Sequence, residues 1–378
     1  MTKKVRFGSS LIVEFEKLAD VDSACRHFEH LQEYRSSVFL SLGWIGPWVS
    51  TIGNDVDLYL LNFIGEKNKI VGSALLARTQ VHRRKLFNID TLSLNEVEAE
   101  GAKFIIEYNN ILHHPEYRED IYYSFFDFLA NSPIQFDELK LNAIDVNHAA
   151  DVSELCAQFN LNFIEEESSR AYFTDLAQFD SDPARYIQKL SKNKREQVRR
   201  SIKFYRQFGT EEIRLASDQH EALQFFDNMG VFHQEYWKGK GCSGSFANDK
   251  WVRFHKDIII NYFHHVQLVR ISFGEHVLGY LYNLVDRDVA YSMQSGFNYS
   301  SNKHDRPGII AHILITNYYI QNSMLRYEYL AGESRYKQSL STSYNTLKWY
   351  SVQRKSAKLF IENFTLKCVR SMKKYVSS

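Results

Sequence analysis

The chain has few cysteines and prolines and no long apolar run. Its 378 residues include four cysteines, which lie far apart at Cys25, Cys156, Cys242 and Cys368 and form no CxxC pair. This spacing argues against a disulfide framework and against a structural zinc site. No apolar stretch approaches the roughly 18 residues that would span a bilayer, and residues 1–20 lack the apolar core of a secretory signal. We therefore expect a cytoplasmic protein without a membrane span.

Neither the charge nor the histidine spacing indicates a polyanionic partner or a metal. The formal net charge is +1, so any attraction to nucleic acid or to an anionic membrane must be local. The adjacent pairs His113–His114 and His264–His265 direct their side chains apart and do not provide the i, i+4 spacing of a metal site. We expect no metal cofactor and no nucleic-acid partner.

The length and composition are typical of a folded protein with two domains. Hydrophobic residues make up 44% of the chain and charged residues 24%, with 27 Phe and 23 Tyr to build large cores. Asp182 before Pro183 is a strong helix start, which places the domain boundary nearby, with domains 1–178 and 179–378. Alternating strands and helices with antiparallel hairpins predict an α/β (α+β) fold with a mixed sheet in each half. The C-terminal part of the chain, after the strand Tyr327–Leu330 and its following loop, is predicted to be a helical tail.

A basic helix is predicted to start at Pro183 and run to about Gln207. Between Lys189 and Arg206 it has an apolar stripe at helical spacing, so that one face packs and the others are cationic. These cations form either a solvated surface or a surface that captures a phosphorylated ligand. The basic residues are Lys189, Lys192, Lys194, Arg195, Arg199, Arg200, Lys203 and Arg206.

A glycine-rich segment, Gly239–Gly244, matches the GxGxxG dinucleotide fingerprint in letters only. That motif needs a strand before it and a helix that starts on its last glycine. Here a predicted helix precedes the segment, so we expect a loop beside the active site. His233 lies on that helix and is either a satisfied core histidine or part of the catalytic cleft.

The strongest candidate for a site is the crossover from Tyr291 to Lys337. A strand ends at Gln294-Ser295, a basic loop follows, and Pro307-Gly308 opens an apolar helix that leads to the next strand. The start of that helix presents free N–H groups beside Lys303 and Arg306, which suits a diphosphate. The loop after the second strand supplies Glu333, Tyr336 and Lys337, unless these residues form only a salt-bridged strand end.

These segments resemble the GNAT-type acetyltransferases of the cellulose-biosynthesis-protein (CelD/BcsL-like) family, and the resemblance covers nearly the whole chain. The segments that carry it are Phe39-Leu40-Ser41 with Trp44 and Trp48, Leu190–Arg195, Phe232-His233-Gln234 with Trp237 and Gly241, Tyr291–Phe297, Pro307-Gly308, and Gly332-Glu333 with Tyr336-Lys337. The resemblance implies two GNAT-like lobes, the second of which holds acetyl-CoA or another acyl-CoA. It further implies transfer to an amine or hydroxyl of a sugar, a sugar nucleotide or an envelope or polysaccharide precursor.

The resemblance assigns candidate roles to individual residues. Glu333 is the expected base, with His233 as the competing choice, and Tyr336 is the expected acid. The donor-binding residues are Gln294, Ser295, Lys303, Arg306, Gly308 and Ile309, and the acceptor-binding residues are Lys337, Trp237 and Tyr291. One departure stands out: the glycine-rich phosphate loop of GNAT enzymes is absent, and Pro307 removes a backbone donor. Lys303, His304 or Arg306 would have to compensate.

Two alternatives remain open at this point. The first is a FemABX-type transferase, which takes an aminoacyl group from charged tRNA and would hold the RNA on the basic helix. The long coiled-coil arm of many such enzymes is missing here. The second is a non-catalytic binding subunit in which the fold persists and the donor site has decayed.

Overall fold

The computed structural model describes residues 3–5, 11–18, 21–52, 56–83, 87–99, 102–104, 106–131, 134–356 and 358–362. Internal contacts divide the chain into two units. Unit 1 comprises Met1–Glu98, Phe104–Ser168 and Lys348–Ser378, and unit 2 comprises Ala99–Lys103 and Ser169–Leu347. These units differ from the predicted domains 1–178 and 179–378 in two respects. The main boundary lies between residues 168 and 169, and residues 348–378 group with unit 1.

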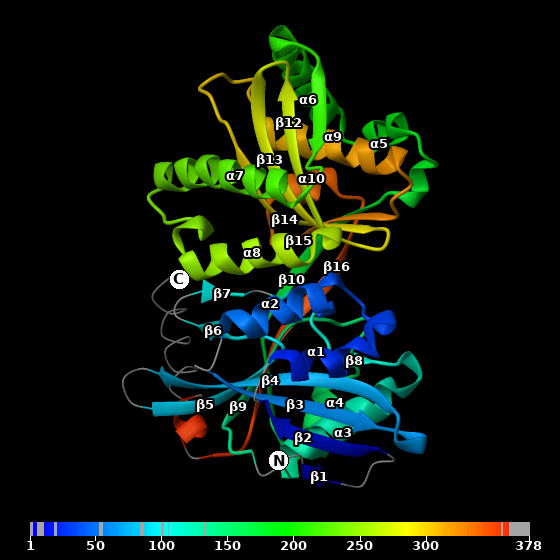
Figure 1. The fold of residues 1–378 in the computed structure, drawn as a ribbon, viewed down its shortest axis with the longest axis vertical. Coiled ribbons are helices and arrows are strands. Elements are labelled where there is room, and N and C mark those ends of the chain that lie inside the picture. Colours follow the sequence, from blue (N-terminus) through cyan, green and yellow to red (C-terminus); the bar gives the residue numbers. More distant parts are fainter. Residues whose placement is uncertain are drawn as a thin grey trace, which may run out of the picture. The chain divides into compact units, whose positions relative to one another are not determined.

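Unit 1 contains a mixed sheet with helices on both faces (Figure 1). Its strands and helices are β1 Lys3–Val5, β2 Ile12–Lys17, α1 Val21–Glu29, α2 Leu42–Ile52, β3 Asp57–Ile64, β4 Ile70–Arg83, β5 Phe87–Leu94, β8 Leu112–His113, α3 Arg118–Asn131, β9 Glu138–Asp145 and α4 Val152–Gln158. The sheet has the order β1-β2-β3-β4-β5-β9, with β8 paired to β4. Strands β1 to β5 are antiparallel, whereas β5 and β9 are parallel. Two short strands, β6 Glu98–Ala99 and β7 Ala102–Lys103, form a separate pair.

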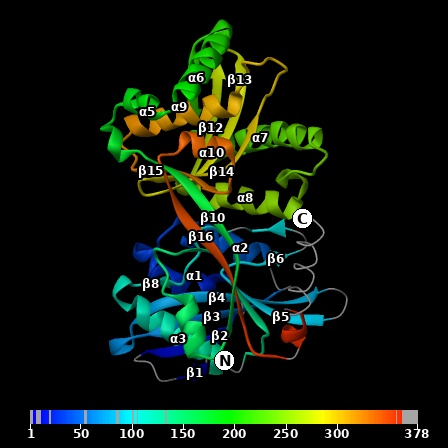
Figure 2. The same cartoon turned by 180° about the vertical axis from the view of Figure 1, so that it is seen from behind.

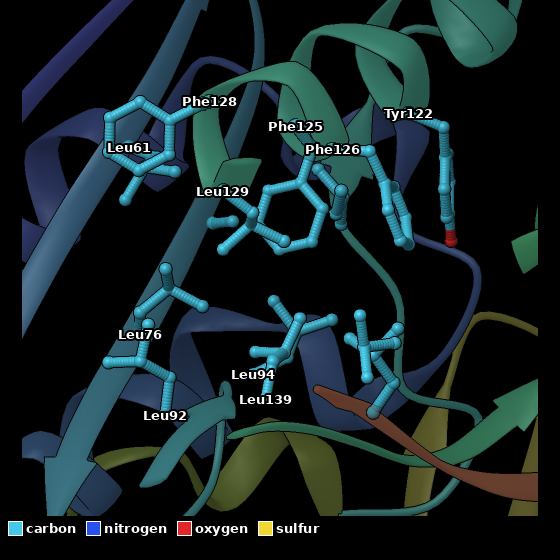
Figure 3. Packing of buried hydrophobic residues seen from close by; sticks show 14 of the residues in the cluster. Leu61, Leu76, Leu92, Leu94, Tyr122, Phe125, Phe126, Phe128, Leu129 and Leu139 are labelled. Atoms are coloured by element: carbon cyan, nitrogen blue, oxygen red, sulfur yellow. The ribbon is translucent and has the colours of Figure 1, made fainter. Parts of the chain in front are cut away.

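The core of unit 1 lies between α3 and its sheet. Figure 3 shows Phe125, Phe126 and Leu129 of α3 facing leucines of the strands, among them Leu76 and Leu92. All five of these side chains are fully buried. An aromatic helix face packed on branched strand residues buries a large apolar area, which is the main stabilising term of such a unit.

The strands of unit 2 also pair in a mixed, parallel and antiparallel, arrangement. Its elements are the second half of β10 (Asn162–Asp175), α5 Pro183–Lys189, α6 Lys192–Tyr205, β11 Glu211–Leu215, α7 Gln219–Gly239, α8 Asp249–Asn261, β12 Val266–Phe273, β13 His276–Asp286, β14 Val289–Phe297, α9 Pro307–Gln321, β15 Arg326–Ala331, α10 Arg335–Leu340 and the first half of β16 (Ser343–Gln353). The strand order is β10-β15-β14-β13-β12-β11. Strands β14 and β15 are parallel and the other pairs are antiparallel. Helix α7 covers one face of this sheet and α9 covers the other, as the two opposite views show (Figures 1 and 2).

Local sequence explains where the helices of unit 2 begin. The Asp182 carboxylate accepts from Ala184 N at 2.9 Å, and Pro183 occupies the first helical position. The Asp218 side chain caps α7 by accepting from Glu221 N at 2.8 Å. The predicted single helix from Pro183 to about Gln207 is wrong in one respect, because a second cap at Ser191 starts α6 anew.

The two units repeat one order of elements. With the short strands β1, β6, β7 and β8 left out, unit 1 runs β2-α1-α2-β3-β4-β5-α3-β9-α4, and unit 2 runs β11-α7-α8-β12-β13-β14-α9-β15-α10. Each repeat then ends in a long strand, β10 or β16. The second half of β10 pairs with β15 in unit 2, whereas β16 from Lys348 onward belongs to unit 1. The predicted mixed α/β fold with a flanked sheet in each lobe is confirmed.

The predicted C-terminal helical tail is wrong for the segment that β16 occupies. Ser343–Gln353 forms a strand because aromatic, β-branched and leucine side chains dominate it, and several of them are buried. Among the described residues, no helix is long and apolar enough to cross a membrane.

Candidate active site

Unit 2 contains a cavity of about 360 Å³ between α7, the end of β14 and the start of α9. Its lining combines aromatic rings with backbone and imidazole groups. The lining residues are His233, Tyr236, Trp237, Gln294, Ser295, Gly296, Phe297, Tyr299, Gly308, Ile309, His312 and Tyr336. An apolar pocket with a few convergent polar groups is the usual form of a small-molecule site.

Strand β14 presents an unpaired edge to this cavity. Its parallel pairing with β15 ends at Tyr291, opposite Glu328, and beyond that point β14 pairs only with β13. A bulge at Met293 accompanies the change, since Gln294 lies opposite Tyr282 and Ser292 opposite Asn283. The backbone N–H of Ser295 therefore donates to the Gln294 side-chain oxygen, at 3.0 Å, instead of to a strand. An extended ligand can replace that side chain and pair with this edge.

Helix α9 begins at the same cavity with unsatisfied backbone donors. Its first residue is Pro307, and its N-cap residue Arg306 provides no side-chain cap. Among the described residues, no partner accepts from the N–H of Gly308 or of Ile309. The N-terminus of a helix is an anion site because these donors and the helix dipole act together.

Two basic side chains lie beside this helix start. The pKa of Lys194, on α6, is lowered, first by burial and then by the positive charge of Arg306. Arg306 itself is exposed, and Lys303 is exposed in the preceding loop. A pair of neighbouring cations is electrostatically unfavourable until an anion binds between them, so Lys194 and Arg306 suit a phosphate. Sequence reasoning placed Lys194 only among the general helix cations and missed this contact.

Helix α6 holds the loop before α9 in place. The Ser201 hydroxyl donates to His304 O at 2.7 Å, and the Tyr205 hydroxyl donates to the Asp305 carboxylate. The same Tyr205 oxygen accepts from Arg306 N at 2.9 Å. The inner face of the basic helix thus positions the loop that leads into α9.

His233 lies on the α7 wall, where its proton position is determined by Trp237. The Trp237 indole N–H donates to His233 Nε2 at 3.0 Å. Because an indole N–H can only donate, Nε2 carries the lone pair and the ring proton sits on Nδ1. Burial lowers the pKa of His233, which keeps the ring neutral. In this arrangement Nε2 is occupied and is not free to take a proton from a substrate.

The opposite wall of the cavity contains a stacked pair of rings, His312 and Tyr336, of which only Tyr336 was predicted from the sequence. The rings of His312 and Tyr336 stack with centroids 5.3 Å apart and an angle of 18°. Burial lowers the pKa of His312 to about 3 and raises the pKa of Tyr336. His312 was missed because it sits in an almost continuously apolar helix, where a lone histidine reads as a core residue.

Several predicted site residues lie elsewhere. Glu333 is exposed and accepts from the Tyr172 hydroxyl at 3.0 Å. The Lys337 ammonium donates to Leu330 O, at 3.2 Å, and to the next carbonyl along the chain. Tyr291 is buried in β14 just before the strands separate. These three, with Lys303 and Arg306, do not line the cavity. The predicted residues that do line it are His233, Trp237, Gln294, Ser295, Gly308, Ile309 and Tyr336.

Unit 1 contains a larger cavity, of about 560 Å³, which includes His30, Tyr34, His114 and Tyr117 in its lining. Exposed charged residues, among them Glu66, Lys69 and Glu116, make up much of its lining, whereas aromatic rings and backbone groups dominate the cavity of unit 2. We therefore treat the smaller cavity of unit 2 as the candidate site. Within the described part of the chain, no group of three or more His, Cys, Asp or Glu side chains could hold a metal ion.

Comparison with known proteins agrees with this choice. Residues 192–338 match the family described as acetyltransferase (GNAT) domain. A comparison with curated proteins finds no match. The resemblance to the CelD/BcsL-like family stays a prediction.

Solved structures show the same fold at low sequence identity. The crystal structure of FemX has a TM-score of 0.57 at 8% identity, over 89% of this chain and 96% of that chain. The C-terminal domain of a candidate lysylphosphatidylglycerol synthetase from Agrobacterium fabrum has a TM-score of 0.53 at 9% identity, over 92% and 97%. L-PGS from Bacillus licheniformis has a TM-score of 0.50 at 10% identity, over 91% and 95%. Residues 192–338 are thus similar to a GNAT-type acetyltransferase domain, and the residues that line the cavity of unit 2 lie within the matched stretch.

Proposed function

We propose that the protein is an acyltransferase that moves an acetyl or longer acyl group from acyl-CoA to an amine or hydroxyl of its acceptor. The observation that carries this proposal is the meeting of two features in one cavity. The unpaired edge of β14 can pair with the amides of a pantetheine arm. The free N–H groups of Gly308 and Ile309, with Arg306 and Lys194, can hold a diphosphate.

In this proposal, the phosphate site does not need the glycine-rich loop that is absent from the sequence. Pro307 lacks an N–H, but the next two residues keep theirs without partners among the described residues. The positive charge that further backbone N–H groups would supply to the phosphates comes instead from the side chains of Lys194 and Arg306, which belong to different elements. We therefore infer that Lys194 and Arg306 make up for the missing backbone donors, and that Lys303 contributes only at longer range.

The transfer itself needs a donor for the developing oxyanion and an acid for the departing thiolate. In the proposal, the acceptor nitrogen or oxygen attacks the thioester carbonyl, the C–S bond breaks, and the acceptor's proton is removed. The Ser295 N–H serves the oxyanion once the ligand displaces the Gln294 side chain. Tyr336, whose raised pKa keeps it protonated, serves as the acid. Glu333 stays a predicted base, although its exposed position outside the cavity does not favour that role.

For the acceptor, we infer a sugar, a sugar nucleotide or a related envelope or polysaccharide precursor. The cavity lining includes three half-exposed aromatic side chains, Tyr236, Trp237 and Tyr299. The rings of Tyr236 and Tyr299 lie 5.3 Å apart. Exposed aromatic surface gathered at a cavity indicates a recognition site, and flat rings suit a sugar or a base. Lys337 and Tyr291, predicted at the acceptor, do not line this cavity.

A second candidate is an aminoacyl-tRNA-dependent transferase. The outer face of α6 exposes Lys192, Arg200 and Lys203, for which no acidic partner is found among the described residues. FemX shares the fold, but at 8% identity that likeness supports the architecture alone. A non-catalytic binding subunit is the third candidate.

Thermal unfolding with acetyl-CoA, CoA and total tRNA separates the three. A ligand at 100 times its dissociation constant stabilises the folded protein by about 2.7 kcal/mol. We expect stabilisation by acetyl-CoA and CoA and none by tRNA. Stabilisation by tRNA alone would contradict the proposal in favour of the second candidate, and stabilisation by none of them would favour the third.

A matched pair of variants sharpens the test. Arg306→Gln removes a cation beside the α9 start, whereas Arg200→Gln removes one from the outer face of α6. If acyl-CoA is the donor, the first variant weakens CoA binding by about tenfold, a typical loss for one charged hydrogen bond, and the second leaves it unchanged. Equal weakening by both variants would indicate a polyanion spread over the helix.

A further inference from the structure

The interior of unit 2 contains a chain of buried hydrogen bonds that ends at the cavity wall. From its outer end, the Tyr319 hydroxyl donates to Gln267 Oε1 at 2.8 Å, and Asn283 Nδ2 donates to Tyr319 at 2.9 Å. The Tyr327 hydroxyl donates to Asn283 Oδ1 at 3.5 Å. His312 Nδ1 lies 3.0 Å from that Tyr327 oxygen. This series of hydrogen bonds therefore runs from Gln267 of β12 to the cavity wall, where it ends at Nδ1 of His312.

The direction of these bonds assigns the tautomer of His312. The Tyr327 hydroxyl, which also bonds with Ser292, donates either to Asn283 Oδ1 or to His312 Nδ1. We infer the first arrangement, in which the proton of a neutral His312 sits on Nδ1 and Nε2 carries the lone pair. Burial, with the charge of Lys337 as the second cause, lowers the pKa of this imidazole, so the ring is neutral in the free protein. It can take up a proton only when a bound ligand places negative charge, such as the developing oxyanion, beside it.

The remaining nitrogen of His312 faces the candidate site. His312 is only 2% exposed to solvent and yet lines the cavity. Among the described residues, no partner is found for Nε2. Stacking against Tyr336 and edge contact with Tyr329, at 5.6 Å, hold the ring plane. The titratable or charged groups that face it are these two tyrosines, Tyr327 and Lys337.

We propose that His312 is the proton acceptor of the transfer reaction and that Tyr327 and Asn283 are positioning residues that keep its Nε2 unprotonated. This inference rests on the proposed acyl transfer. As the acceptor's nitrogen or oxygen bonds to the acyl carbon, its proton passes to Nε2 of His312. The C–S bond breaks and the Tyr336 hydroxyl gives its proton to the thiolate. After the thiol leaves, solvent carries the imidazolium proton to the Tyr336 oxygen. Protons and electrons balance, with no other reactant.

His233 provides the contrast within the same cavity. Both histidines are neutral with the proton on Nδ1, but Nε2 of His233 is bonded by the Trp237 indole at 3.0 Å. A base must have its lone pair within reach of the substrate proton. The geometry thus selects His312 over His233 without any difference in tautomer.

The tautomer can be measured without knowing the donor. In protein labelled with 15N-histidine, long-range 1H–15N spectra distinguish a protonated from an unprotonated ring nitrogen. We expect His312 to show Nδ1–H and a bare Nε2 from pH 6 to pH 8. In Tyr327→Phe, which removes the acceptor of the Nδ1 proton, the signal should shift towards the Nε2–H form. A wild-type spectrum with Nε2–H, or with both nitrogens protonated at pH 6, would overturn the proposal.

Turnover supplies the second measurement. Thiol release from acetyl-CoA, with hydroxylamine as the acceptor, is followed in wild type, in His312→Gln and in Tyr327→Phe. A lost general base lowers the rate by about 10²- to 10⁴-fold. We expect such a fall in kcat for His312→Gln with CoA affinity unchanged, and a smaller fall with an altered pH profile for Tyr327→Phe. The matched control is His255→Gln, since His255 is equally buried and bonded to Tyr282 but does not line the cavity.

The outcomes separate this proposal from the proposed function. If acetyl-CoA binds and His312→Gln keeps the wild-type rate, the base assignment is wrong while the acyltransferase stands. If acetyl-CoA does not bind at all, the proposed donor is wrong, and the wild-type spectrum still decides the tautomer. A rate loss in His255→Gln as large as in His312→Gln would show a general effect of core damage and would overturn the assignment.

Discussion

A methyl group at Gly296 tests whether α7 and β14 are packed as closely as the cavity requires. A Cβ at this position would lie 2.1 Å from the Met229 carbonyl oxygen and 3.1 Å from His233 N. Ordinary contacts between heavy atoms lie at about 3.5–4.0 Å, so the overlap exceeds about 1 Å. The obstructing atoms are helix backbone, which cannot rotate away as a side chain can. Helix α7 would have to move as a whole.

We expect Gly296→Ala to lower the free energy of unfolding by about 3 kcal/mol, at the upper end of overpacking costs. For a unit of this size, that corresponds to a fall in Tm of about 6–12 °C. Because α7 also contributes His233 to the cavity, CoA affinity should fall too. Differential scanning calorimetry and CoA titration measure both effects.

The control for this prediction is Gly239→Ala. Gly239 ends the same helix, and a Cβ there would meet nothing within 4 Å. Its substitution should change the unfolding free energy by no more than about 1 kcal/mol, in the stabilising direction. If Gly296→Ala melted within 2 °C of wild type, the close approach of α7 to β14, and with it the described cavity wall, would be refuted.

Three further predictions concern the side chains around the site. Trp237→Phe removes the donor to His233 Nε2, so the pKa of His233 should rise towards its ordinary value; an unchanged NMR titration would contradict the bond. Tyr205→Phe removes the hydroxyl that holds Asp305, which should cost about 1–3 kcal/mol in urea unfolding and weaken CoA binding; unchanged stability would show that the loop is held otherwise. Burial lowers the pKa of His255 to about 3, so below about pH 6.5 the unfolded state binds a proton that the folded state does not bind. The contribution of His255 to the stability of the folded state is therefore complete above about pH 6.5 and is lost as the pH falls towards 3. The unfolding free energy should therefore drop by up to about 1.4 kcal/mol per pH unit for this residue below pH 6, and His255→Gln should show a shallower decline than wild type.

Much of unit 2 could be predicted because its signals are local. Helix caps, a proline at a first helical turn and alternating strands mark the β14-α9-β15 crossover in the sequence itself. Residues at the ends of neighbouring elements then meet at one place, which is why Gln294, Ser295, Gly308 and Tyr336 share a cavity. Their chemical roles stay predictions, since position alone does not assign them.

What could not be predicted depends on contacts between distant segments. Helix α9 is apolar on all sides, so its sequence does not reveal that His312 faces a cavity and not the core. Lys194 gains its place only when α6 docks against the loop before Arg306. Glu333 follows directly after β15 in the chain, yet the Tyr172 hydroxyl holds it outside the cavity. The assignment of β16 from Lys348 onward to unit 1 likewise depends on contacts between distant segments, which no local pattern encodes.

Hydrogen exchange of the backbone amides with saturating CoA tests the central claim most directly. The N–H groups of Gly308 and Ile309 have no partner among the described residues, and that of Ser295 has only a side chain. They should exchange fast in the free protein and become protected when CoA binds, whereas the groove of unit 1 should not change. Unchanged exchange at all three amides under saturating CoA, or protection confined to unit 1, would contradict the account.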